Sequence, residues 1–267
     1  MADPLWNRLL NPGNAAPGWE LFHENSKITR FSDFLSDDEV RQRMAAIWQT
    51  LPMAHAPAIA LPGPQEMARP DLSVTETMRR RQTVDNMTAA PISLPVLAAL
   101  LYHMAGADSA RGQEDRPFRL VPSGGALYPL ELFAHLRAVE GLAPGLYYYN
   151  PLAHSLHAVG SGDRSAEIAK ALVQPGLVAD SAVQLFQTAR FERSTFKYGD
   201  RGYRFALMEA GHQAQNLGLM ATALGLGCIH VGGYRDHAVD GLLGLDGIGH
   251  STVYLGFIGT PEGQDGE

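Results

Sequence analysis

The stretch from Tyr203 to Leu226 constrains the fold most, because it predicts one long helix that ends at Gly225 and Gly227. Many of its residues are small, which lets another backbone approach closely: Ala206, Ala210, Gly211, Ala214, Gly218, Ala221 and Ala223. Polar residues at spacings of three and four share one of its faces: Glu209, His212, Gln213 and Asn216. Because such a helix carries little charge, we expect it to be mostly buried, against the core, a twin subunit or a cofactor.

The rest of the chain alternates between predicted strands and predicted helices. Apolar runs predict strands over residues 130–139, 145–150, 154–159, 182–189, 229–234 and 252–258. Capping residues and helical spacing predict helices near residues 75–81 and over 93–106, 164–173 and 236–243. This interleaving predicts one α+β or mixed α/β body.

The first 74 residues are expected to form an N-terminal arm and helix, ahead of a main domain at residues 75–267. Large aromatic side chains in the first 35 residues predict an arm that packs on that domain: Trp6, Trp19, Phe22, Phe31 and Phe34. Ser36 and Glu39 form a capping box, and the helix that follows should turn four side chains inward: Val40, Met44, Ile47 and Trp48. Residues 51–74, rich in Pro and Ala, predict an extended connector.

Composition excludes several classes of function. The chain has 21 basic and 28 acidic residues, a formal net charge of −7, whereas nucleic-acid binding requires a basic surface. No apolar run reaches the roughly 20 residues of a membrane helix. We therefore expect neither nucleic acid nor membrane as a partner. The single cysteine, Cys228, cannot form an internal disulfide, and the N-terminus lacks the pattern of a signal peptide, so we expect a cytoplasmic protein.

Two glycine pairs can present backbone amides to a flat or anionic ligand. Gly124 and Gly125 follow Ser123 just before a predicted strand, and Gly232 and Gly233 follow another. The first pair lacks the Gly-Lys-Ser/Thr of a P-loop, and no G-x-G-x-x-G fingerprint opens a helix after a strand. Each pair alone is weak evidence, because turns use the same residues.

The segment from Lys197 to Arg204 concentrates groups that transfer protons or hold anions. From composition alone it can equally be a solvated turn that leads into the long helix. Cys228 follows Gly227 into an apolar strand, which favours a buried and inert thiol. No metal site is expected, since the ten histidines show no H-E-x-x-H spacing.

Six stretches, in this order, resemble the SagB/ThcOx branch of the nitroreductase superfamily. They are FHENSK (22–27), RLVPSGGALYPLE (119–131), PGLYYYNP (144–151), KYGDRGYR (197–204), EAGHQAQN (209–216) and GLG (225–227). The resemblance implies an α+β, nitroreductase-like fold, with a central, mostly antiparallel sheet flanked by helices. It implies an entwined homodimer with two FMN sites at its interface, where the long helix would lie.

The resemblance also implies an activity. An FMN-dependent dehydrogenase of this branch would oxidise thiazoline or oxazoline rings, in a peptide or a related small-molecule biosynthetic intermediate, to the aromatic azole. A cyclodehydratase complex is the partner that this activity implies. Two alternatives stay open: an NAD(P)H-dependent nitro or quinone reductase, and a non-catalytic subunit that binds FMN or a peptide.

The resemblance assigns roles to individual residues. Lys197 and Tyr198 match the catalytic pair of the azoline dehydrogenases. The loop that touches the flavin ring matches Pro122, Ser123, Gly124 and Gly125, and the segment at the N5 and O4 edge matches Gly232 and Gly233. The element that holds the phosphate and ribityl chain matches Arg80, Arg81 and Thr83, with Arg79 beside them.

This chain departs from the family pattern at the phosphate. Val84 and Asp85 stand where relatives repeat a basic residue, and the segment after Gly259 lacks Lys and Arg. We therefore expect the phosphate to depend on Arg79–Arg81 together with Arg201 or Arg204.

Overall fold

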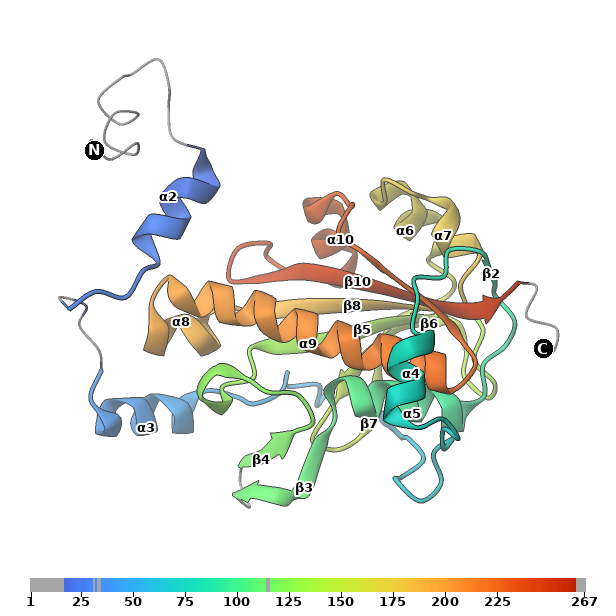
Figure 1. Ribbon diagram of the computed structural model, residues 1–267, viewed down its shortest axis with the longest axis horizontal. Helices are drawn as coiled ribbons and strands as arrows, with labels where there is room; N and C mark the ends of the chain where they lie inside the picture. Colours follow the sequence, from blue (N-terminus) through green and yellow to red (C-terminus); the bar gives the residue numbers. More distant parts are fainter. Residues whose placement is uncertain (1–16, 31, 33–34, 114–115, 263–267) are drawn as a thin grey trace.

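A twisted sheet with helices on both faces forms the centre of the computed structural model, which describes residues 17–30, 32, 35–113 and 116–262 (Figure 1). The strands lie in the order β1-β7-β6-β5-β8-β10-β2, and β9 pairs with β10. All of these pairs are antiparallel. The α+β fold with a mostly antiparallel central sheet is therefore confirmed.

Six of these strands were expected from the sequence, with small shifts at their ends. They are β5 (Leu130–Leu136), β6 (Gly145–Asn150), β7 (Ser155–Ser161), β8 (Val183–Arg190), β9 (Gly227–Val231) and β10 (His250–Pro261). Short edge strands were not expected: β1 (Ala58–Ala60) and β2 (Met87–Thr88). A separate hairpin of β3 (Ala107–Gln113) and β4 (Arg116–Arg119) was also missed.

The helices divide between the two faces of the sheet. On one face lie α5 (Leu94–Ala105) and α9 (Arg201–Ala223), with α4 (Val74–Arg80) against α9. On the other lie α6 (Ser165–Ala171), α7 (Gly176–Ala179) and α10 (Asp236–Leu243). Alternation along β5 explains both contacts, since Leu132 and Ala134 belong to the core under α5 while Phe133 belongs to the core under α6.

Two short helices precede the sheet: α2 (Gly18–Asn25) and α3 (Asp37–Ala46). The Ser36–Glu39 capping box is present at the start of α3. Val40 is buried as expected, but the side chain of Trp48 is 58% exposed, so its inward placement was wrong. The reason is that α3 ends at Ala46 and the chain leaves in an extended conformation at Ile47.

Of the N-terminal aromatics, Phe22 packs edge-on against Tyr203, with ring centroids 5.3 Å apart. Trp19 is 69% exposed, contrary to the expected packing. Trp6, Phe31 and Phe34 lie outside the described residues.

The long helix α9 is confirmed, but its polar stripe divides into two parts. Glu209 and Gln213 are buried, whereas His212 is exposed. Gln187 of β8 donates to the carbonyl of Ala210 at 2.9 Å and to Gln213 at 3.2 Å. A polar stripe is therefore not one surface: part of it faces the sheet and part faces outward.

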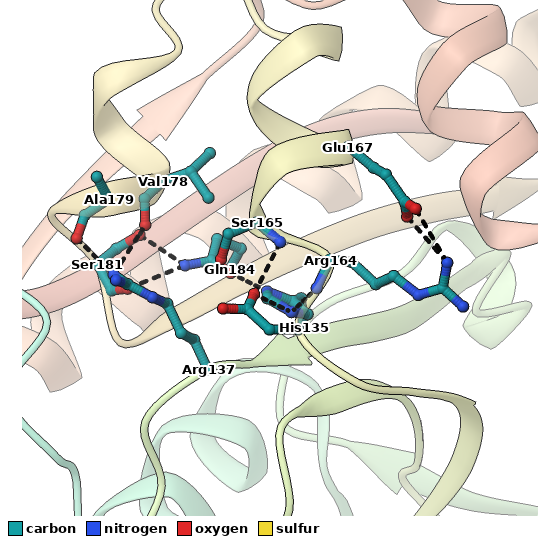
Figure 2. Close-up of polar contacts among 10 residues, drawn as sticks. His135, Arg137, Arg164, Ser165, Glu167, Val178, Ala179, Ser181 and Gln184 are labelled. Atoms are coloured by element: carbon teal, nitrogen blue, oxygen red, sulfur yellow. Dashed lines mark hydrogen bonds and ion pairs between the residues drawn. The ribbon is translucent and has the colours of Figure 1, made fainter.

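A buried polar network (Figure 2) holds α6 and α7 to the central strands β5 and β8, on the face of the sheet opposite α9. His135 of β5 hydrogen-bonds Gln184 of β8, and Gln184 donates to the Ser181 hydroxyl at 2.7 Å. The other ring nitrogen of His135 accepts from the Arg164 backbone at 2.9 Å. Burial lowers the pKa of His135, so the neutral ring that this pattern requires is the stable form.

Within the described part of the chain, α9 is the only helix with the length of a membrane span, and it is too polar to serve as one.

Candidate functional site at the start of α9

The corner between α8 (Glu192–Tyr198) and α9 positions Lys197 and Tyr198, the last two residues of α8. The two helices meet closely at Gly202, where a Cβ atom would lie 2.7 Å from the backbone of Ser194 and Thr195. Only glycine allows this approach without a shift of backbone. The segment expected to be either a site or a solvated turn is thus a rigid helix end.

The loop from Pro122 to Pro129 lies against this corner. A Cβ atom on Gly125 would be 2.5 Å from the Tyr198 hydroxyl and 3.2 Å from Lys197 Nζ. Gly125 has a φ of 66°, and two non-glycine residues of the loop also have positive φ, Ala126 at 53° and Tyr128 at 46°. Strained backbone of this kind is typical of functional loops. The structure thus joins the Ser-Gly-Gly loop to the Lys-Tyr pair.

One face of α9 packs against the loop through Phe205 and Glu209. A Cβ atom on Gly124 would lie 3.0 Å from the ring of Phe205, which also packs edge-on against Tyr198 at 4.9 Å. One helical turn further on, the carboxyl of Glu209 faces Ser123. Neither carboxyl oxygen makes a hydrogen bond of normal geometry, although Ser123 and the Leu130 backbone are close to it.

Burial raises the pKa of the Glu209 carboxyl to about 7, while Ser123 and the charges of Arg119 and Arg193 act in the opposite direction. The loop therefore rests on an acid that changes its charge near neutral pH. Sequence reasoning placed Glu209 only in a polar stripe.

A buried ion pair beside Glu209 was missed. Arg193 of α8 lies 2.6 Å from Glu131 of β5, and both side chains are almost fully buried. Tyr148 donates to the other Glu131 oxygen at 2.8 Å, which helps to satisfy the carboxylate. The signal was a glutamate inside the apolar run LELFAHL, since a charge in a buried strand requires a partner.

A second group of expected residues lies further along α9. The side chain of Arg81 lies over Gly218, with its Cδ 3.9 Å from where a Cβ atom of that glycine would be, and it acts electrostatically on His230 of β9. Thr83 is exposed, and the next residue, Val84, donates its N–H to the Cys228 carbonyl at 3.1 Å. This places residues 81–84 along β9.

Gly232 and Gly233 follow β9 directly and are exposed. A Cβ atom on Gly232 would meet no atom within 4 Å, so its backbone is open to a ligand. Nearby, the Cys228 thiol is buried as expected, and burial raises its pKa to about 12, which disfavours the reactive thiolate.

The three consecutive arginines do not act together. Glu76 binds both Arg79 and Arg80, the former at 2.7 Å, and these two arginines line a cavity of about 700 Å³ beside the end of α9. Arg81 points elsewhere, onto Gly218. Arg201 and Arg204 lie at the opposite end of α9, where they bind the carbonyls of Ser26 and His23. The structure does not bring Arg201 or Arg204 to Arg81.

The two groups are each suited to part of an FMN molecule. The half-buried Arg81, which Glu76 does not engage, suits a phosphate, and the open backbone of Gly232 suits the edge of a flat ring. At Ser123–Gly125 the Cβ sides of the two glycines face Phe205, Tyr198 and Lys197, so a ring would contact the loop on its other side. Nine residues separate Glu209 from Gly218, or about 14 Å of helix, so the two groups are separate candidate partial sites within one chain.

The chain is similar in sequence to known proteins. The chain is 36% identical over 173 residues to the nitroreductase-type protein MJ1384 of Methanocaldococcus jannaschii, which covers 65% of this chain and 85% of that protein. It is 33% identical over 160 residues to the microcin B17-processing protein McbC of Escherichia coli, which covers 55% of each. The chain thus spans about half the length of McbC.

A solved structure is also similar. A chain of the E. coli microcin synthetase McbBCD complex, with truncated pro-MccB17 bound, superposes with a TM-score of 0.60 at 26% identity. The superposition covers 90% of this chain and 91% of that one. The model of the nitroreductase family matches residues 78–260, the whole sheet except β1 and every helix from α5 to α10. The protein belongs to the nitroreductase family.

Proposed function

We propose that this protein is an FMN-dependent dehydrogenase that oxidises thiazoline or oxazoline rings in a peptide or a related biosynthetic intermediate. The observation that carries the proposal is the contact of Gly125 with the ends of Lys197 and Tyr198. Two motifs that are more than 70 residues apart, and weak when taken separately, meet there. Members of the nitroreductase family generally bind FMN, and McbC is by name a peptide-processing protein.

The proposal includes a homodimer. The outer face of α9 leaves Leu207 and Met208 exposed, together with Gly211. An apolar cavity of about 330 Å³ opens beside it, between α4, α5 and α9. A twofold partner that covers this face would bring the second partial site of one chain to the first partial site of the other. Each FMN would then be held by Ser123–Gly125 from one chain and Arg81, Thr83, Gly232 and Gly233 from its partner.

The residues of this chain have distinct tasks in such a reaction. Aromatising an azoline removes a hydride and a proton, and bound FMN supplies the acceptor for the hydride. Lys197 Nζ or the Tyr198 oxygen, in its deprotonated form, would take the proton from one ring carbon while the hydride leaves the other ring carbon. Lys197 Nζ lies 5.2 Å from the Tyr198 ring, and Phe205 and Gly125 hold that ring in place. The site therefore presents two adjacent proton-accepting atoms to one point.

The proposal also covers the domains, the location and the partner of the protein. We propose residues 75–267 as the FMN-binding domain, residues 1–74 as its N-terminal arm and helix, and the cytoplasm as the location. A cyclodehydratase complex is the proposed partner, because an azoline must be formed before it is oxidised.

The test uses the purified full chain and a thiazoline-containing peptide. We expect a yellow protein that removes two hydrogens per ring. Mass spectrometry measures this as a loss of two hydrogens from the peptide. Lys197→Ala and Tyr198→Phe should keep FMN bound and slow ring oxidation by about 100-fold or more, the contribution typical of a positioned base. Unchanged oxidation in both variants at full FMN occupancy would remove the pair from the mechanism.

The same preparation distinguishes the two alternatives. Fast bleaching of the flavin by NADH, with consumption of a nitroaromatic or quinone, would favour a reductase. A colourless protein that turns over neither substrate would favour a non-catalytic subunit.

A further inference from the structure

The N-terminal segment FHENSKI (22–28), here called the strap, is fastened to the start of α9. Arg204 donates to the His23 carbonyl at 2.6 Å, and Arg201 donates through Nε to the Ser26 carbonyl at 3.1 Å. Between them, Tyr203 packs edge-on against Phe22. Three consecutive contacts from one helix end hold a segment that lies more than 170 residues away in the sequence.

Ser26 is the best-packed residue of the strap. It is buried, and its hydroxyl donates to the Phe22 carbonyl at the end of α2. Its chain neighbours Asn25 and Lys27 are exposed. The strap is thus attached through Phe22, His23 and Ser26, while the neighbouring side chains of Asn25 and Lys27 stay accessible.

A cavity of about 250 Å³ lies between the strap and the Lys-Tyr pair. Asn25, Ser26 and Lys27 line one side, and Lys197, Tyr198 and Asp200 line the other. Its volume is just below the roughly 300 Å³ at which pockets for whole small molecules begin, so it has room for one residue-sized group. The lining is mostly polar and is suited to a peptide backbone or a polar side chain.

We propose that the strap is a substrate-positioning wall of the catalytic site. This proposal rests on the proposed function. Fastened by Arg201, Tyr203 and Arg204, the strap shields Lys197 and Tyr198 on one side. It also holds the polar residue that lies next to the azoline in a peptide substrate. In this arrangement Arg201 and Arg204 hold the strap, and Phe22 positions it through its contact with Tyr203. Ser26, which lines the cavity, becomes a specificity-determining residue. The FHENSK motif then has a task that the flavin site does not give it.

The first experiment measures how far Lys197 is shielded, independently of turnover. The FMN-loaded full chain is acetylated with N-hydroxysuccinimide acetate, and mass spectrometry compares Lys197 with Lys170, an exposed residue of α6. Arg204→Ala and Phe22→Ala should each speed the labelling of Lys197 relative to Lys170 by roughly three- to tenfold, the effect of losing one typical hydrogen bond or one aromatic ring contact. Trp19→Ala, in the exposed part of α2, is the matched control and should match the wild type.

The second experiment measures selection between substrates. One probe is a single thiazoline-4-carboxamide ring, and the other carries the same ring inside a tripeptide. Arg204→Ala and Phe22→Ala should raise KM for the tripeptide probe by about tenfold and for the single ring by much less, because only the tripeptide reaches the cavity. Trp19→Ala should change neither value.

The outcomes separate this proposal from the proposed function. If the wild type oxidises neither probe but the strap variants expose Lys197, the azoline activity fails and the shielding wall stands. If both probes are oxidised and neither labelling nor KM responds in folded variants, the wall is overturned. Equal acceleration of labelling in Trp19→Ala would also overturn it, since that residue makes none of the fastening contacts.

Discussion

At the scale of single residues, Glu209 is the group with the most consequence for the site. It combines near-complete burial, two carboxyl oxygens without regular hydrogen bonds, and a position directly under Ser123. A buried acid without partners is costly to ionise, and this is why its pKa rises to about 7. The sequence showed a glutamate on a helix face. Only the packing of the loop on α9 shows that its carboxyl is removed from water.

Glu209 predicts a pH dependence whose sign is opposite to that of an ordinary carboxylate. Its folded pKa lies above the unfolded value of about 4.5, so its contribution to stability is complete below pH 4.5 and is lost as the pH rises through 7. Glu209→Gln keeps the neutral form at every pH. The difference in melting temperature between this variant and the wild type should grow in the variant's favour from pH 5 to pH 8. Parallel melting curves across this range would contradict the assignment.

At the scale of elements, the loop at 122–129 and the α8–α9 corner form one unit. The loop was expected to touch a ligand, and the corner was expected to carry the catalytic pair, but neither motif indicated the other. Their contact depends on Gly202, which lets α8 approach α9, and on Gly125, which leaves room for Tyr198. Each glycine acts by leaving space for a neighbouring element. That effect cannot be predicted until the position of the neighbouring element is known.

Gly125→Ala tests this unit. The new Cβ would add strain of roughly 1–2 kcal/mol at positive φ and would also displace the Tyr198 hydroxyl, 2.5 Å away. Gly141→Ala is the matched control, since Gly141 has a φ of 78° and no atom within 4 Å of the added Cβ. We expect similar losses of melting temperature in the two variants. Azoline oxidation should fall by at least tenfold only in Gly125→Ala, because a base must be closely positioned. Equal activity in both variants would show that the contact does not matter.

At the scale of the whole molecule, α9 organises the protein. It packs on the sheet through Leu217 and Ala221, carries the corner and the loop near its start, and holds Arg81 near its end. Its outer face exposes Leu207 and Met208 beside the polar His212 and Gln215, and nothing within the described residues covers it. The proposed twofold partner would cover this face and complete both cofactor sites at once.

Leu207→Asp tests the proposed dimer. A charge at the centre of the outer face of α9 should convert a dimer into monomers, measured by light scattering, and should release FMN, measured by absorbance after gel filtration. Ile248→Asp is the control, because Ile248 is equally apolar and 84% exposed but lies in the loop before β10. A wild-type monomer that retains FMN, or a Leu207→Asp dimer with full FMN, would refute the composite site.

The sequence by itself determined the strands, the long helix and the family motifs. The reason is that hydrophobic period, capping residues and glycine positions act between residues that are near neighbours in the chain. The antiparallel sheet and the residues of the candidate site were predicted only through the resemblance that these motifs carry. Only the tertiary structure decided which of these residues meet: Lys197 and Tyr198 with Gly125, Arg81 with Gly218, and Arg201 and Arg204 with the strap. Such meetings depend on contacts between segments far apart in the chain, and no local pattern of residues records them.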